Sequence, residues 1–340
     1  MKKVFLVDSF SGGHHKIYSD KLLSIKDTIQ VIKEYKFNDK SLLGYIKSRL
    51  NFIRRIHEEC NFYNCEKTIH FLYFDSLYTI SFINYFSQFT NTSFIGTIHR
   101  MPDNYIKILL LKKASKKMDK IIVNSEYMME YLQKYNINNV EVVDYPILHD
   151  NLKYKDINVI NKEKIIVSAL GGTRWDKGLD ILLEAFKYLD TEYKDRILLN
   201  IVGKEEFFSE SYILKKSKEY GINSKVFLKE VSNDEFEYNI NISDIIVIPY
   251  RKVFTGNSGP MTEAIYRGIP CIVADHSNLG YLTKKYDLGI CFKCGDSIDL
   301  ANKIKHMIMN KWKPSCNTKE YIKRINPDYF IKKHEKIYFG

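Results

Sequence analysis

Short runs of β-branched and aromatic residues alternate with segments of helical periodicity along almost the whole chain. This alternation is typical of βαβ units, in which each helix returns the chain to the same edge of a parallel sheet. The pattern runs from Lys3–Asp8 to Val140–Asp144, is interrupted by the polar residues 146–163, and starts again at Lys164–Ala169. We therefore predict an α/β protein with two domains, each built on a parallel sheet, and a cleft between them.

The interruption sets the predicted domain boundaries. We expect an N-terminal domain over residues 1–150, a second domain over 160–315, and C-terminal helices over 316–340 that pack back on the N-terminal domain. A length of 340 residues fits two domains of ordinary size. Ligands of open parallel sheets bind beyond the carboxyl ends of strands, so we expect function in three loops, residues 9–16, 170–178 and 250–263.

Charge and composition narrow the class of protein. The chain has 52 Lys and Arg against 41 Asp and Glu, a net charge of +11 without a basic tail, which fits an anionic small molecule or an acidic membrane surface better than nucleic acid. No stretch approaches the ~18 apolar residues of a spanning helix, and the N-terminal apolar run ends at Asp8, so we expect a cytoplasmic protein. Cys291 and Cys294 form a CxxC without a second pair at zinc spacing, and we interpret them as strand residues.

The loop Leu170–Gly178 (LGGTRWDKG) follows a predicted strand and opens a helix. Its glycines allow a tight turn and close approach to a ligand. Arg174 and Lys177 place two cations beside a helix start, where free N–H groups already favour anions. A guanidinium fork and an ammonium point charge together suit a diphosphate. The alternative is a solvated turn with two surface cations.

The loop that follows the strand Asp244–Pro249 has the features of a second binding segment. Ser258 and Pro260 predict the cap and first turn of a helix, and Gly256 and Gly259 leave backbone amides open. Glu263 lies about one turn into that helix, where a carboxylate can accept hydrogen bonds from a vicinal diol such as a ribose. Together the two loops predict a nucleotide-sugar site. Taken alone, Glu263 is better explained as a helix-surface carboxylate near the positive end of the helix dipole.

These segments resemble the GT-B glycosyltransferases of family 4, which are mostly retaining. The resemblance covers roughly residues 164–310 and rests on four stretches in the family's order, namely Gly171–Phe186, Ser243–Tyr250, Ser258–Ala274 and Asp287–Gly289. The N-terminal half matches more loosely, at the glycine loop after the first strand, Thr97–His99 and Lys120–Glu126. The resemblance implies the GT-B fold, two Rossmann-like domains whose parallel sheets face a central cleft.

The resemblance also implies roles for individual residues. Arg174 and Lys177 correspond to the basic pair that neutralises the donor diphosphate, and His99 to a catalytic histidine near the reacting sugar. Glu263 corresponds to the second glutamate of the E-x7-E motif, which holds the ribose, whereas Thr255 replaces the first glutamate, as in a subgroup that carries a Ser-Gly such as Ser258-Gly259. The implied donor-binding residues are Gly172, Thr173, Gly203, Thr255, Gly256, Asn257, Ser258, Gly259 and Glu263, and those on the acceptor side are Gly12, Gly13 and His14.

We therefore predict a hexosyltransferase that moves a sugar from a UDP- or GDP-linked donor to a hydroxyl of a glycan or lipid-linked saccharide in surface polysaccharide biosynthesis. Retention, no metal and no cofactor are expected, and no Asp-x-Asp motif is present. Two alternatives stay open: a catalytically silent subunit that supports a partner enzyme, which Thr255 favours, and a nucleotide-sugar epimerase.

A basic segment and three histidines complete these expectations. The segment Lys107–Lys120 is basic and amphipathic, and we expect it to contact an anionic membrane peripherally, with Arg49, Arg54 and Arg55 on the same surface. A packed helix with a solvated lysine face explains the segment equally well. His57, His306 and His334 are expected at the surface.

Overall fold

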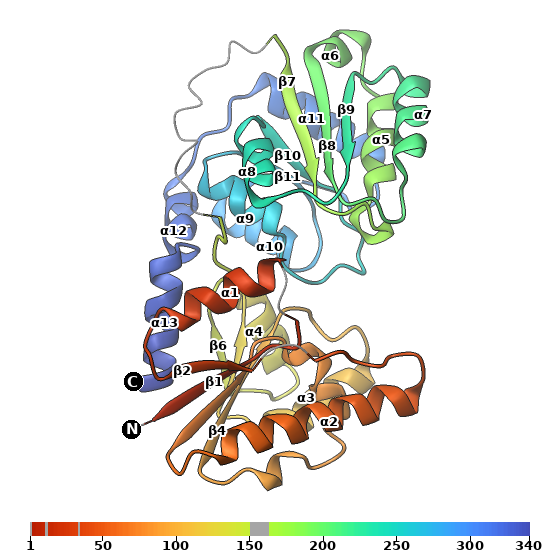
Figure 1. The fold of residues 1–340 in the computed structure, drawn as a ribbon. Coiled ribbons are helices and arrows are strands. Elements are labelled where there is room, and N and C mark those ends of the chain that lie inside the picture. The colour runs from red at the N-terminus through yellow and green to blue at the C-terminus, as the bar shows by residue number, and fades with distance from the viewer. Residues whose placement is uncertain (1, 11–12, 33–34, 150–162) are drawn as a thin grey trace. The chain divides into compact units, whose positions relative to one another are not determined.

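A computed structural model describes residues 2–10, 13–32, 35–149 and 163–340 of the chain. The chain divides into two compact units, the first comprising Met1–Leu148 with Pro327–Gly340 and the second His149–Asn326. Each unit contains a six-stranded sheet whose neighbouring strands run parallel (Figure 1). The predicted alternation of strands and helices in an α/β fold is therefore confirmed.

The sheet of the first unit has the strand order β2-β1-β3-β4-β5-β6. Its strands are β1 (Lys3–Val7), β2 (Ile29–Ile32), β3 (Lys67–Phe71), β4 (Thr92–Ile98), β5 (Lys120–Val123) and β6 (Val140–Val142). The helices of this unit are α1 (Gly13–Leu23), α2 (Leu42–Asn61), α3 (Tyr105–Ser115), α4 (Glu126–Gln133) and α13 (Pro327–Phe339). Three short 3-10 turns, Phe74–Ser76, Tyr78–Ile80 and Phe86–Gln88, lie between β3 and β4.

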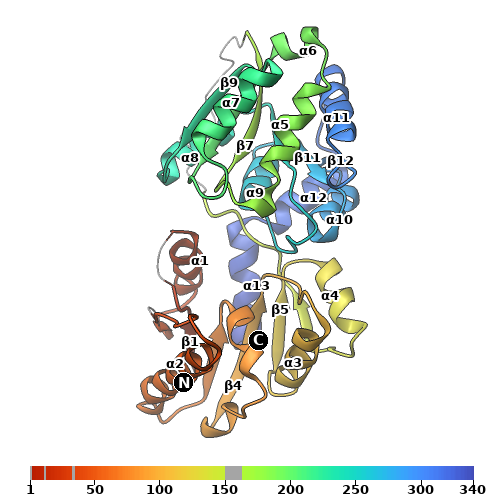
Figure 2. The ribbon, with the colours of Figure 1, turned by 90° about the vertical axis from the view of Figure 1, so that its right-hand side faces the viewer.

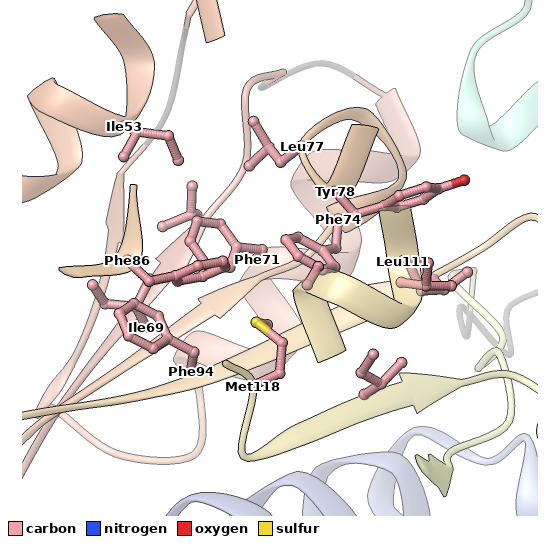
Figure 3. Packing of buried hydrophobic residues seen from close by; sticks show 14 of the residues in the cluster. Ile53, Ile69, Phe71, Phe74, Leu77, Tyr78, Phe86, Phe94, Leu111 and Met118 are labelled. Atoms are coloured by element: carbon pink, nitrogen blue, oxygen red, sulfur yellow. The ribbon is translucent and has the colours of Figure 1, made fainter. Parts of the chain in front are cut away.

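Successive side chains of a strand point to opposite faces of this sheet, and helices cover both faces. Phe5 and Val7 belong to the core under α2, α3 and α4, whereas Val4 and Leu6 pack with α1 and α13 on the opposite face (Figure 1). Phenylalanines after β3 fill the first of these cores, where the Phe74 ring lies 5.5 Å from that of Phe71 (Figure 3). Dense packing of this kind fixes the carboxyl ends of the strands, from which loops leave the sheet.

Helix α13 corrects one expectation about the histidines. His334 is fully buried rather than exposed, since Phe330, His334 and Tyr338 are spaced four residues apart and form the helical face that packs on the first sheet. The His334 Nδ1 donates to the Phe330 carbonyl at 3.0 Å. His70 of β3 is buried beneath this helix, and its Nδ1 lies 2.6 Å from the Tyr338 hydroxyl.

The basic segment also differs from its prediction. The helix α3 ends at Ser115, and Lys120 begins β5 and pairs with Glu141 at 2.6 Å, so Lys107–Lys120 is not one continuous helix. Arg49 does not add to a basic surface, because its guanidinium is buried, pairs with Asp39 at 2.6 Å and donates to the Ser76 carbonyl at 2.8 Å.

The sheet of the second unit has the order β12-β11-β10-β7-β8-β9. Its strands are β7 (Ile165–Leu170), β8 (Ile197–Gly203), β9 (Ser224–Leu228), β10 (Ile245–Ile248), β11 (Cys271–Ala274) and β12 (Gly289–Phe292). The helices are α5 (Leu179–Lys187), α6 (Thr191–Arg196), α7 (Glu210–Tyr220), α8 (Asn233–Asn241), α9 (Gly259–Tyr266), α10 (Ser277–Tyr286), α11 (Ser297–Met309) and α12 (Cys316–Arg324). Figure 2 shows α5 between α7 and α11 on one face of this sheet.

The strand order determines which loops of the second unit meet. The central strand β7 pairs with β10 on one side and with β8 on the other. The chain reverses its direction of strand addition at β7, and such a switch point is where parallel sheets of this type bind ligands. The loops that follow β7, β8 and β10 therefore leave the same edge of the sheet side by side.

Candidate functional site

Gly178 brings the loops after β7 and β10 into direct contact. Its backbone has φ +64°, a conformation that favours glycine, and a Cβ at this position would overlap the carbonyl oxygen of Pro249. A hydrogen bond of 2.9 Å from the Arg251 amide to the Asp176 carbonyl joins the same two loops. The two segments singled out in the sequence are thus held together in the second unit.

Arg174 is oriented by a carboxylate two residues away. Its Nε and Nη2 donate to the two carboxylate oxygens of Asp176 at 2.9 and 2.7 Å, a bidentate arrangement. The hydrogen bond with Asp176 is the main reason why the pKa of Arg174 is raised, so the guanidinium stays charged at all physiological pH values. With 40% of its side chain exposed, Arg174 keeps donors available for an anion.

Lys177 is held by aromatic rings instead of by a carboxylate. Its Nζ lies 3.7 Å from the centroid of the Tyr250 ring and 4.5 Å from that of Phe254. No acidic side chain of the described residues forms an ion pair with Lys177. Cation–π contacts position the ammonium but leave its charge uncompensated, which favours an incoming anion.

A pocket lies between the two loops at the edge of the second sheet. Gly171, Gly172 and Thr173 of the loop after β7 line it together with Lys177 and Tyr250. Ile201 of β8 and Val247 of β10 also line it. The structure therefore brings three predicted residues, Gly172, Thr173 and Lys177, into one pocket, with Arg174 on the adjoining turn.

The start of α9 is built as predicted. Ser258 caps the helix through a hydrogen bond from the Met261 amide, and Pro260 occupies its first turn. The Ser258 hydroxyl lies 3.2 Å from that of Tyr250, which connects the cap to the pocket wall. A Cβ on Gly259 would meet no atom within 4 Å, so the backbone there is open.

The beginning of α10 holds the loop between β10 and α9. Asn278 donates to the Asn257 side chain at 2.6 Å, the His276 Nε2 donates to the Tyr250 carbonyl at 2.9 Å, and the Ser277 hydroxyl donates to the Phe254 carbonyl at 3.2 Å. The predicted residues Thr255, Gly256 and Asn257 lie on this loop, outside the residues that line the pocket. Their donor-binding role stays a prediction.

Glu263 lies in a buried ionic cluster. Its carboxylate accepts from the Arg267 Nη1 at 2.6 Å and from the His149 amide at 3.1 Å, and Arg267 also donates to the His149 carbonyl. Glu263 is not among the residues that line the pocket, so its ribose-binding role stays a prediction.

Gly203, at the end of β8, has φ +150° and packs against the Gly171 carbonyl, where a Cβ would overlap.

The predicted residues of the first unit lie at the carboxyl ends of β1 and β4. Gly12 is outside the described residues, Gly13 begins α1, and His14 is exposed. The Nε2 of His99 donates to the Leu72 carbonyl at 2.8 Å, and its amide donates to Asp75 at 3.0 Å. Burial lowers the pKa of His99, so the ring is neutral near pH 7 and its Nδ1 is an acceptor.

Asp8 and Tyr73, which lie near these positions, were not anticipated from the sequence as site residues. The buried Asp8 carboxylate accepts from the His15 Nδ1 at 3.0 Å, and the His15 ring stacks on Tyr73 at 3.8 Å, which in turn stacks on His99 at 4.3 Å. In the second unit the missed residues are Asp176 and Tyr250. The position of Asp8 at the end of the first strand was the one local signal that it lies beside these residues.

Two features are absent from the residues that the structure describes. No group of three or more His, Cys, Asp or Glu side chains there is arranged to hold a metal ion. No helix in the part of the chain that the structure describes is long and apolar enough to cross a membrane.

Comparisons with known proteins concern the family and the fold of the chain. The model of the family described as "Glycosyl transferases group 1" matches residues 150–325. No curated protein matches the sequence.

Several solved structures share the fold over almost their whole length. Sucrose-phosphate synthase from Thermosynechococcus elongatus has a TM-score of 0.77 at 16% identity, with 99% of this chain and 98% of that chain covered. HepE of Anabaena in complex with UDP has a TM-score of 0.72 at 15% identity, with 99% of both chains covered. A UDP-forming α,α-trehalose-phosphate synthase from Burkholderia vietnamiensis has a TM-score of 0.74 at 8% identity, again over 99% of both. The GT-B fold predicted from the sequence is confirmed.

Proposed function

The chain belongs to the group 1 glycosyl transferases, and we propose that it transfers a sugar from a nucleotide diphosphate donor to a hydroxyl acceptor with retention and without a metal ion. The observation that carries this proposal is the pair of cations at the edge of the second sheet. Arg174 is fixed by Asp176, and the uncompensated Lys177 lines a pocket together with the glycine turn. Two fixed cations and open backbone amides suit a diphosphate.

The donor is proposed to be a UDP- or GDP-linked hexose. HepE of Anabaena was solved in complex with UDP and with UDP-glucose, which favours the uridine nucleotide as the first to test. Thr255 stands where family 4 often has its first glutamate, so we place the chain in the subgroup with Ser258-Gly259 and without that glutamate. Glu263 is the proposed ligand of the ribose.

The chemistry follows from the charge that develops on the leaving group. As the bond between the sugar C1 and the phosphate oxygen breaks, negative charge grows on the diphosphate, and Arg174 and Lys177 stabilise it. Each preorganised donor of this kind contributes about 3 kcal/mol to transition-state stabilisation. The acceptor oxygen bonds to C1 on the face that the diphosphate leaves, and the acceptor proton passes to a leaving phosphate oxygen. The reaction then needs no protein nucleophile.

The acceptor is proposed to be a glycan or lipid-linked saccharide of a surface polysaccharide, bound by the first unit. His99 is neutral and offers its Nδ1 as an acceptor at the end of β4, which suits contact with a sugar hydroxyl. Tyr105 and Ile106 on α3 are exposed large side chains beside Lys107. Apolar side chains beside lysines support peripheral contact with an anionic membrane on its cytoplasmic face.

The test is transfer or hydrolysis of nucleotide sugars by the purified chain. Arg174→Ala and Lys177→Ala should each lower turnover about 100-fold, while Lys187→Ala, at the far end of α5, serves as a charge-matched control with full activity. Full activity in both site variants would contradict the proposal. A wild-type chain that binds the donor but turns over nothing would favour the silent subunit, and conversion without an acceptor would favour the epimerase.

A further inference from the structure

The loop after β8 places a carboxylate beside the proposed diphosphate site. An ideal Cβ built on Gly172 would lie 2.2 Å from the Glu206 Oε2, so the Glu206 carboxylate lies directly over the glycine turn that lines the pocket. The charge of Glu206 also contributes to the raised pKa of Arg174. Glu206 is therefore close to both the turn and the first of the two cations.

The position of Glu206 is fixed by its backbone. The hydroxyl of Thr173, a buried residue of the glycine turn, accepts from the Glu206 amide at 2.9 Å and donates to the Phe208 carbonyl at 2.7 Å. Two backbone hydrogen bonds of 3.0 Å, from Thr173 to Lys204 and from Phe208 to Thr173, join the same segments. Thr173 thus attaches the loop after β8 to the loop after β7 and holds Glu206 at the pocket.

Among the described residues, the Glu206 carboxylate has no hydrogen-bond or ion-pair partner. In residues 2–10, 13–32, 35–149 and 163–340, no side chain or amide donates a hydrogen bond to Glu206 or forms an ion pair with it. Its neighbour Glu205 differs, because the Glu205 Oε2 accepts from the Glu210 amide at 3.0 Å at the start of α7. An unpaired carboxylate beside an anion site repels an anionic ligand and lowers the affinity for it, unless the ligand itself donates a hydrogen bond to the carboxylate.

We propose that Glu206 is a specificity-determining residue of the donor site, whose carboxylate accepts a hydrogen bond from a hydroxyl of the nucleotide sugar. A nucleotide sugar offers such hydroxyls on the ribose and on the transferred sugar, and the two sources share this chemistry. The inference rests on the proposed function, since it requires that the donor bind in this pocket. A hydrogen bond to a charged acceptor is among the stronger ones, so its loss weakens binding about tenfold or more.

Calorimetric titration of the full chain with UDP, 2′-deoxy-UDP and UDP-glucose tests the proposal. Glu206→Ala should bind UDP-glucose at least about tenfold more weakly than the wild type, while Glu205→Ala, which removes the same charge from the adjacent position, should bind it as the wild type does. A loss for UDP-glucose alone identifies a hydroxyl of the transferred sugar. An equal loss of affinity for UDP and for UDP-glucose, with no loss for 2′-deoxy-UDP, identifies a hydroxyl of the ribose.

Two results overturn the proposal for Glu206, and a third result would instead overturn the proposed function. Unchanged affinity of Glu206→Ala for all three ligands, or tighter binding of all three through relief of repulsion, shows that the carboxylate recognises no hydroxyl. If the wild-type chain binds none of these ligands, nor GDP-mannose or GDP, the proposed donor chemistry itself has failed. Because Glu206 is exposed, its substitution does not endanger the fold.

Discussion

Gly178 offers the sharpest test of how the proposed donor site is assembled. Gly178→Ala forces a residue with a side chain into φ +64°, which costs about 1–2 kcal/mol of folding stability. The added Cβ would lie 2.0 Å from the Pro249 carbonyl oxygen, at least 1 Å inside the 3.0 Å below which real Cβ contacts are essentially unknown. The loops after β7 and β10 must therefore separate, which adds the cost of overpacking, about 1–3 kcal/mol, so we expect a total loss of about 2–5 kcal/mol.

Gly221 provides a matched control for this substitution. It lies in the same unit at the end of α7 with φ +65°, but a Cβ there would meet nothing within 4 Å. Gly221→Ala should cost only the conformational part, about 1–2 kcal/mol, or a fall in Tm of roughly 2–8 °C. Thermal and urea unfolding of both variants measure the difference, which isolates the contact with Pro249.

The same substitution should affect catalysis. Lys177 immediately precedes Gly178, so a separation of 1 Å at Pro249 displaces the ammonium from the Tyr250 ring. Misplacement of that size can lower turnover about 100-fold. Equal unfolding free energies for Gly178→Ala and Gly221→Ala, together with full activity of both, would refute the idea that close contact between these loops builds the site.

Three further predictions concern other parts of the chain. Gly172→Ala should displace the flexible Glu206 carboxylate without unfolding the chain, so its loss of UDP-glucose affinity should match that of Glu206→Ala and the double variant should lose no more, whereas additive losses would contradict the overlap. Ser258→Ala removes the cap of α9 and should lower stability by about 1 kcal/mol in urea unfolding, with an unchanged value arguing against the cap. Burial lowers the pKa of His334 to about 4 from its ordinary 6.5, so the unfolded chain binds more protons between these values, and stability should be complete above pH 6.5 and fall by roughly 3 kcal/mol as the pH decreases to 4. Urea titrations of the wild type and His334→Phe at several pH values measure this slope, which should be shallower in the variant; identical slopes would contradict the assignment.

Local signals in the sequence were sufficient for the strands, the helix start at Ser258 and the positions of the loops after β7 and β10. Each of these depends on residues within a few positions of one another, such as Ser258 and Pro260 at one helix end. His334 and Arg49 were expected at the surface and are buried, because their surroundings are set by packing partners far along the chain. Glu206 likewise escaped notice, since its approach to Gly172 depends on the pairing of β7 with β8.

The predicted site residues of the first unit show the same distinction. The position of His99 at the end of β4 follows from the strand pattern, but its neutral state follows from burial, which outweighs the opposing effect of its hydrogen bond to the Leu72 carbonyl in the turn after β3. The pairing of Asp8 with His15 joins the end of β1 to the first turns of α1. Sequence spacing locates such ends, whereas the contacts between them require the packed fold.

A crystal structure of the chain with UDP bound tests the central claim most directly. We predict that the pyrophosphate oxygens lie within about 3 Å of the Arg174 guanidinium and the Lys177 ammonium, above the turn formed by Gly171 and Gly172. A pyrophosphate bound elsewhere, with both cations still facing solvent, would contradict the account of the donor site.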